Sequence, residues 1–198
     1  MIEPRDLVLA SHNPGKLLEL RELLADSSWR LRSAAEFGLT EPDETASTFV
    51  ENALIKARYA SEQTGLPALA DDSGLVVDAL AGAPGVRSAR YAGENATDAA
   101  NIEQLLAAAT GLEAAGRNCR FVCVIAFLRS ANDPIPIIAE GVWAGRLLRI
   151  PRGTGGFGYD PIFLDQESGR SAAELSASQK HAISHRGKAL AALRARLQ

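Results

Sequence analysis

The 198-residue sequence has few of the features that mark secreted, fibrous or membrane proteins. It contains only two cysteines, too few for the disulfide framework of a small secreted domain. Its longest apolar stretches, such as the one around residues 121–128, are strand-sized and fall far short of the roughly 18–20 apolar residues of a membrane span. We therefore expect a globular protein that contains no membrane segment.

The sequence also lacks an excess of positive charge. It has 21 Lys and Arg residues against 24 Asp and Glu residues, which gives a formal net charge of −3. This balance offers no general basic field for nucleic acid, so a polyanionic ligand must meet a local cluster of cations. The first residues include an acid where a secretory signal has its basic region, which predicts a cytoplasmic protein.

The two cysteines, Cys119 and Cys123, lie four residues apart in a run that alternates like a strand. Both side chains then point to the same face of that strand. Buried free thiols in a reducing compartment are the expected state, ahead of a disulfide or a metal pair.

Strand-like and helix-like segments alternate along the chain, which predicts an α/β fold in one domain over residues 1–198. Strands are expected at 6–10, 29–33, 66–70, 75–77, 120–128 and 135–143, the last two as a hairpin, and helices at 17–24, 49–64, 97–110, 172–182 and 187–197. Thr48 and Glu51 form a capping-box pattern, and Gly65 ends the same helix. An acidic turn at 71–74 is expected to separate two short strands.

The segment Ser11-His12-Asn13-Pro14-Gly15-Lys16 follows the first expected strand and precedes a helix. A helix N-terminus presents unpaired N–H groups with partial positive charge and a lysine adds a full one, so this loop is suited to phosphate oxygens. It lacks the G-x-x-x-x-G-K-[ST] pattern of a Walker loop. A plain loop with a solvated lysine remains the alternative for this segment taken alone.

Carboxylates stand at the end of a loop, at Glu44, and at the end of a strand, at Asp71 and Asp72. Mg²⁺ takes oxygen ligands, uses one or two carboxylates, and completes its shell with water and substrate phosphates. Two acids from separate segments suit that ion. A capped turn is the commoner use of an Asp-Asp-Ser-Gly tetrapeptide and is the alternative here.

Two further segments carry groups suited to a nucleoside. In R-G-T-G-G-F-G-Y-D-P (residues 152–161) the glycines allow close backbone approach, Phe157 and Tyr159 offer stacking faces, and Asp160 offers an acceptor. In K-H-A-I-S-H-R-G-K (residues 180–188) the two histidines have the spacing of a helical metal pair, but flanking cations would repel a metal ion. This cluster suits phosphates or base carbonyls, against the alternative of a solvated helix end.

Six motifs in order extend nearly from end to end of the chain. They are S-x-N-x-x-K (Ser11, Asn13, Lys16), F-x-E-N-A-x-x-K-A (49–57), D-D-S-G-L (71–75), G-A-P-G-V-x-S-A-R-Y (82–91), G-T-G-G-F-G-Y-D-P-I-F (153–163) and S-H-R-G-x-A-L (184–190). In this series the chain closely resembles the inosine/xanthosine triphosphate pyrophosphatase family.

The resemblance implies a Mg²⁺-dependent hydrolase that converts dITP, ITP and XTP or dXTP to the monophosphate and pyrophosphate. It also implies a homodimer of elongated, two-lobed α/β chains, each with a long mixed sheet flanked by helices and an active cleft between the lobes. No nucleic-acid or membrane partner is implied.

Carried over residue by residue, the resemblance assigns roles to seventeen positions. Glu44 and Asp72 would hold Mg²⁺, and Asp72 would also be the catalytic base. The triphosphate and the rest of the substrate would contact Ser11, His12, Asn13, Pro14, Gly15, Lys16, Lys56 and Ser73, and the nucleoside would contact Phe157, Gly158, Tyr159, Asp160, Lys180, His185 and Arg186.

Two other functions use some of the same residues. One is a related pyrophosphatase that acts on modified pyrimidine or methylated nucleotides, with the same magnesium chemistry and a different base pocket. The other is a non-catalytic nucleotide-binding module, which would be expected to have lost an acid such as Glu44 or Asp72. Both acids are present, which favours catalysis.

Overall fold

The computed structural model describes residues 5–11, 20–21, 24 and 28–197. Its strands are β1 (Arg5–Leu9), β2 (Trp29–Ser33), β3 (Ala68–Val77), β4 (Asn118–Leu128), β5 (Ile137–Leu147) and β6 (Phe163–Leu164). Its α-helices from residue 28 onward are α2 (Phe49–Thr64), α3 (Asp98–Ala108), α4 (Ala177–Ile183) and α5 (His185–Leu197). The helix expected at 17–24 lies largely outside the described residues.

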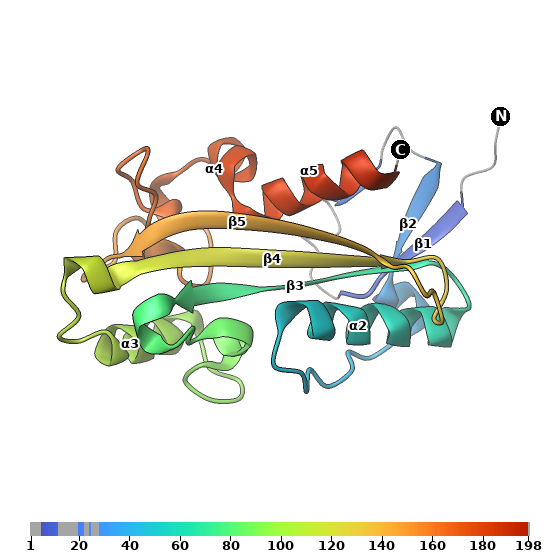
Figure 1. Cartoon of the computed structure of the whole chain (residues 1–198), viewed down its shortest axis with the longest axis horizontal. Helices are drawn as coiled ribbons and strands as arrows, with labels where there is room; N and C mark the ends of the chain where they lie inside the picture. Colours follow the sequence, from blue (N-terminus) through green and yellow to red (C-terminus); the bar gives the residue numbers. More distant parts are fainter. Residues whose placement is uncertain (1–4, 12–19, 22–23, 25–27, 198) are drawn as a thin grey trace. The chain divides into compact units, whose positions relative to one another are not determined.

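The six strands form one mixed sheet in the order β2-β1-β3-β4-β5-β6 (Figure 1). Strand β1 pairs in parallel with both β2 and β3, and β5 pairs antiparallel with β6. In the β1–β3 pair, Leu9 lies opposite Leu69, and the side chains at this register are buried. The expected α/β class, a mixed sheet flanked by helices, is therefore confirmed.

The described chain gathers into two compact units. Unit 1 comprises residues 1–72, 124–140 and 189–198, and unit 2 comprises residues 73–123 and 141–188. Unit 1 holds β1, β2 and α2, and unit 2 holds α3, α4 and β6. The organisation as a single domain over residues 1–198 stays a prediction.

Helix α2 begins and ends where its capping residues require. The Thr48 hydroxyl accepts a hydrogen bond from the Glu51 amide at 3.3 Å, and the left-handed Gly65 donates its N–H to the Ser61 carbonyl at 2.9 Å. Small side chains at Ala53 and Ala57 let the helix pack closely, and both are fully buried. The expected bounds of this helix are confirmed.

Strand β3 corrects one expectation. Residues 71–74 were expected to form a turn between two short strands, but β3 runs unbroken from Ala68 to Val77 and includes both aspartates. Strand β3 lies between β1 and β4 in the sheet and buries both aspartates, and this tertiary context overrides the turn propensity of the segment.

The C-terminal helices also differ from expectation. Helix α4 begins only at Ala177, because Ser176 and Gln179 form a capping box there, and residues 172–174 form a short 3₁₀ turn. Helix α5 begins at His185, two residues earlier than expected. The expected hairpin strands are confirmed as β4 and β5, which are neighbours in the sheet.

Aromatic rings fill the core of unit 2. The ring centroid of Phe163 lies 4.6 Å from that of Phe121 and 4.7 Å from that of Trp143. Cys119 and Cys123 are buried free thiols, as expected, and burial raises the pKa of Cys119 to about 12, so it stays protonated. Of the helices that the structure describes, none has the length and apolar character to span a membrane.

Close packing of β5 against β6 predicts that Gly145→Ala destabilises the protein. An alanine Cβ at this position would lie 2.4 Å from the Phe163 ring and 2.6 Å from the Leu164 carbonyl oxygen. Relieving such overlap shifts the core at a cost of about 1–3 kcal/mol, measurable as a lower urea midpoint. Gly116→Ala is the matched control, because its nearest new contact is 3.6 Å. Equal midpoints for the two variants would contradict this packing account.

Candidate functional site

The chemically densest part of unit 1 is a lysine held between carboxylates. The Lys56 ammonium lies 2.6 Å from Glu44 Oε1 and 3.5 Å from Asp72 Oδ1. Lys56 comes from the inner face of α2, Asp72 from β3, and Glu44 from the loop before α2. The lysine and aspartate side chains are each more than nine-tenths buried, and Glu44 is half-buried. We call these three residues the acid–lysine cluster.

Asn52 positions the loop that carries Glu44. It lies one helical turn before Lys56 on α2 and is fully buried, and its Oδ1 accepts a hydrogen bond from the Ala46 amide at 3.0 Å. This bond ties the loop to the helix two residues after Glu44. Sequence reasoning assigned Asn52 no role, although its i, i+4 spacing from Lys56 was a usable signal.

Burial and mutual repulsion set the proton affinities in the acid–lysine cluster. Burial raises the pKa of Asp72, and Glu44 and Asp71 raise it further, although Lys56 and Asn52 oppose them. Burial alone would lower the pKa of Lys56, but the surrounding carboxylates raise it above its ordinary value. The lysine therefore stays charged, and Asp72 is a stronger proton acceptor than an exposed aspartate.

The chemistry of the cluster fits Mg²⁺. Glu44 and Asp72 supply two hard oxygen donors from separate segments, and Asp71 adds negative charge nearby. The described residues contain no group of three or more His, Cys, Asp or Glu side chains arranged to hold a metal ion. The ion would therefore complete its shell with water and phosphate oxygens, as Mg²⁺ usually does.

The expected phosphate loop is described only at its start. Ser11 is buried and follows β1, and the preceding residue Ala10 donates its N–H to the Leu69 carbonyl of β3 at 2.8 Å. Leu9, at the end of β1, lies opposite Leu69 of β3, two residues before Asp71. The other loop residues, His12, Asn13, Pro14, Gly15 and Lys16, lie outside the described residues.

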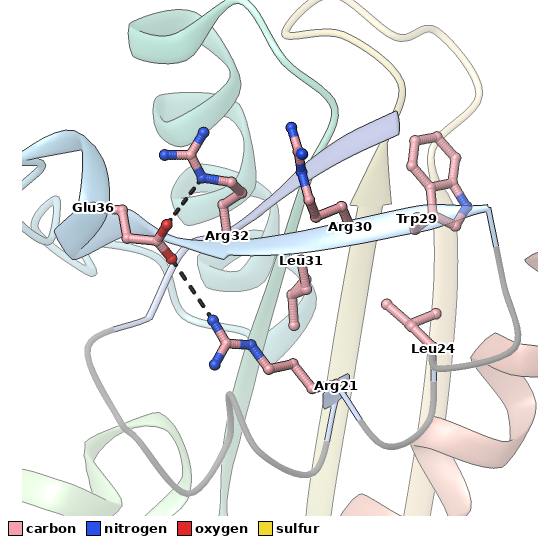
Figure 2. Close-up of a pocket in the computed structure, with 7 residues that line it drawn as sticks. All are labelled: Arg21, Leu24, Trp29, Arg30, Leu31, Arg32 and Glu36. Carbon is pink, nitrogen blue, oxygen red and sulfur yellow. Dashed lines mark hydrogen bonds and ion pairs between the residues drawn. The ribbon is translucent and has the colours of Figure 1, made fainter. Parts of the chain in front are cut away.

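A cavity of about 580 Å³ in unit 1 contains none of the expected site residues (Figure 2). It is lined by Arg21, Leu24, Trp29, Arg30, Leu31, Arg32 and Glu36. Its arginines already have acidic partners: Arg30 Nε lies 2.5 Å from Asp6 Oδ1, and Arg32 Nε lies 2.9 Å from Glu36 Oε2. The cavity therefore offers little uncompensated charge to a ligand.

In unit 2, Asp160 joins the glycine-rich segment to the basic segment. This buried carboxylate accepts a hydrogen bond from the Phe157 amide at 2.9 Å and forms an ion pair with Lys180 of α4. Gly156, at φ +74°, leaves the room that Asp160 occupies, because a Cβ there would lie 2.0 Å from its Oδ2. Two segments that are twenty residues apart thus meet at one carboxylate.

Phe157 presents its ring beside two cations. Its ring is 60% exposed, with the Lys180 ammonium 4.6 Å and the Arg186 guanidinium 6.0 Å from the ring centroid. We call Phe157, Asp160, Lys180 and Arg186 the aromatic–cation cluster. An exposed ring flanked by charged donors can stack on a planar ligand and donate hydrogen bonds to its edge.

The structure also describes four other expected site residues. Tyr159 was expected to offer a stacking face, but it is buried in the core and its hydroxyl donates to the Ser88 carbonyl at 2.8 Å. His185 is buried and stacks on Phe121, with ring centroids 4.8 Å apart. The Gly158 amide donates to Asp98 Oδ2 at 2.6 Å, a tertiary contact across sixty residues that sequence reasoning missed. Ser73 follows Asp72 on β3.

The chain is similar to known proteins in both sequence and structure. The sequence model of the Ham1 family matches residues 7–196. A protein of Idiomarina loihiensis named dITP/XTP pyrophosphatase is 56% identical over 188 residues, which cover 93% of each chain. The structure of a HAM1 protein from Coxiella burnetii has a TM-score of 0.95 and 53% identity and covers 98% of both chains. A nucleoside-triphosphatase / dITP/XTP pyrophosphatase from Mycobacterium abscessus has a TM-score of 0.83 at 44% identity, with 98% and 100% covered.

The acid–lysine cluster predicts that Lys56→Met destabilises the protein and makes it more responsive to Mg²⁺. Removing the buried ammonium leaves Glu44 and Asp72 to repel each other, at a cost of about 3 kcal/mol. Urea unfolding in chelator should show this loss, and Mg²⁺ should restore more stability to the variant than it adds to the unaltered protein.

Arg58→Met, at an exposed cation on the same helix, is the matched control and should change neither quantity. An Mg²⁺ response that is no larger in Lys56→Met than in the control would count against a cation site at these carboxylates.

Proposed function

Because this chain belongs to the Ham1 family, we propose that it hydrolyses dITP, ITP and XTP or dXTP to the nucleoside monophosphate and pyrophosphate. The activity would remove deaminated purines from the nucleotide pool. The observation that carries this proposal within the chain is the acid–lysine cluster, where a buried lysine is held between two carboxylates. The names of the relatives supply the substrate class.

Mg²⁺ is the proposed cofactor, held by Glu44 and Asp72. When bound, the ion supplies positive charge that offsets the negative charge of the phosphate oxygens. Lys56 lies between the same carboxylates, so its positive charge offsets theirs. Its remaining donor capacity suits it to a phosphate oxygen as well.

Asp72 is the proposed general base. Its raised pKa makes it a better acceptor for the proton of an attacking water than an exposed aspartate would be. The water attacks the α-phosphorus, Asp72 takes its proton, and the bond from that phosphorus to the bridging oxygen breaks to release pyrophosphate. The segment Ser11 to Lys16 and Ser73 would hold the triphosphate in line for this attack.

The aromatic–cation cluster is the proposed site for the base. Hypoxanthine and xanthine carry an acceptor oxygen at C6, where adenine carries an amino donor. Lys180 and Arg186 can donate hydrogen bonds to this oxygen. They cannot accept a hydrogen bond from the adenine amino group, because both side chains are donors only. Phe157 offers a stacking face, and the ion pair with Asp160 holds Lys180 in place. Gly158, Tyr159 and His185 would shape the surroundings of the nucleoside.

The proposal includes homodimeric assembly, which the family resemblance implies and which sedimentation or light scattering would test. It also includes a cytoplasmic location, because the proposed substrates belong to the cellular nucleotide pool.

The proposed function predicts the products formed from a panel of ITP, dITP, XTP, ATP and GTP, with pyrophosphate scored separately from orthophosphate. We expect pyrophosphate from the first three alone, and only when Mg²⁺ is present. Orthophosphate as the product, or preferential turnover of modified pyrimidine or methylated nucleotides, would overturn the proposal.

Asp72→Asn is the control for the panel. Loss of the base should lower kcat by about 10²–10⁴ while nucleotide binding stays measurable. Tight binding with no turnover in the unaltered protein would instead identify a binding module.

The aromatic–cation cluster predicts that Lys180→Ala erodes selectivity. Removing the donor should lower the ratio of kcat/KM for ITP to that for ATP by at least about tenfold, because a polar pocket discriminates through groups left unpaired. The matched control is His181→Ala, which alters an exposed neighbour on the same helix. An unchanged ratio would show that Lys180 does not recognise the base.

A further inference from the structure

A second cavity, in unit 2, lies at the end of β5. It has a volume of about 280 Å³ and is lined by Ala114, Arg117, Arg146, Leu147, Leu148, Arg149 and Leu164. Three of these seven side chains are arginines, and the others are apolar. We call it the arginine pocket. It shares no lining residue with the acid–lysine or the aromatic–cation cluster.

Arg117 is buried at the base of this pocket, with only 5% of its surface exposed. Its Nε donates to the Leu147 carbonyl at 2.8 Å, its Nη2 to the Leu148 carbonyl at 2.7 Å, and its Nη1 to the Ala109 carbonyl at 3.1 Å. These bonds fix the guanidinium through backbone carbonyls, and no carboxylate among the described residues pairs with its charge. A buried charge is normally paired, because its desolvation is otherwise costly.

Two further guanidiniums are held beside it by backbone carbonyls. Arg146 Nη2 donates to Ala114 O at 3.2 Å, and Arg149 Nη2 donates to Leu112 O at 3.0 Å. Within the described part of the chain, none of the three arginines forms an ion pair with a carboxylate.

The electrostatics of Arg117 agree with this geometry. Burial lowers the pKa of Arg117, and the like charges of Arg149 and Arg146 lower it further. Three positive charges thus gather at one pocket of a chain whose formal net charge is −3. Such a concentration of one sign favours a counter-ion of high charge.

We propose that the arginine pocket binds a small multivalent oxyanion of the phosphate class. Guanidinium groups recognise tetrahedral oxyanions through paired N–H bonds, and the side chains of Leu147 and Leu164 border the same pocket. The volume lies just below the roughly 300–1,000 Å³ of a site for drug-sized ligands, so it accommodates orthophosphate or pyrophosphate but not a whole nucleoside triphosphate. This inference is independent of the proposed function, because it concerns binding of an inorganic anion.

The test is a titration of the full chain with inorganic pyrophosphate and, separately, with orthophosphate, in chelator, followed by NMR. The backbone amides of residues 146–149 and the Arg117 Nε–H should shift and saturate, with pyrophosphate binding more tightly because it carries more charge. ITP forms a third arm. If ITP binds more tightly than pyrophosphate at these resonances, the pocket is not limited to small anions and the proposal is wrong. If no anion gives a saturable shift, the pocket is not an anion site.

Variants tie those shifts to the pocket. Arg149→Gln and Arg146→Gln should each weaken pyrophosphate binding at these resonances by roughly tenfold. Arg58→Gln removes one exposed positive charge from α2 and is the matched control. Arg149 is exposed, so its variant keeps the fold and decides the outcome by itself if Arg146→Gln fails to fold. Equal affinity in Arg149→Gln and Arg58→Gln would refute the proposal.

Discussion

A buried ammonium group between carboxylates is the constraint on which unit 1 depends. Lys56 and Asp72 are both almost removed from water, and neither would be tolerable alone, since an isolated buried charge is strongly destabilising. Together with Glu44 and Asp71 they form an arrangement in which three carboxyl groups act on one lysine, so one positive charge does not balance the acids. This excess of acids is the basis for the proposal that a divalent cation binds there.

Unit 2 also contains a buried charged group with a compensating partner, but here the buried group is a carboxylate. Asp160 is buried and compensated by Lys180, and it also fixes the backbone of the glycine-rich segment through the Phe157 amide. The result is an exposed ring whose position is set by a buried carboxylate. In both units the groups proposed to meet substrate are thus held by polar contacts inside the protein, which positions them before any ligand arrives.

Much of the fold could be predicted from local patterns. Helix α2 has its cap, its small buried face and its terminal glycine in the sequence itself, so its bounds agree with the structure. Strand β3 could not be predicted in the same way. Its Asp-Asp-Ser-Gly segment has the composition of a turn, but burial within the sheet overrides that local preference. The predicted start of α4 was wrong because residues 172–174 form a separate 3₁₀ turn. The helix itself begins after the capping box of Ser176 and Gln179.

The sequence by itself determined the family, the α/β class and the candidate residues, because ordered motifs and residue types are properties of the chain. Tertiary structure decided which of these residues meet. It brought Glu44 and Asp72 to one lysine, moved the Tyr159 ring into the core while leaving Phe157 exposed, and gathered Arg117, Arg146 and Arg149 around one pocket. Burial and pairing depend on distances between segments far apart in the chain, and no local pattern encodes those distances.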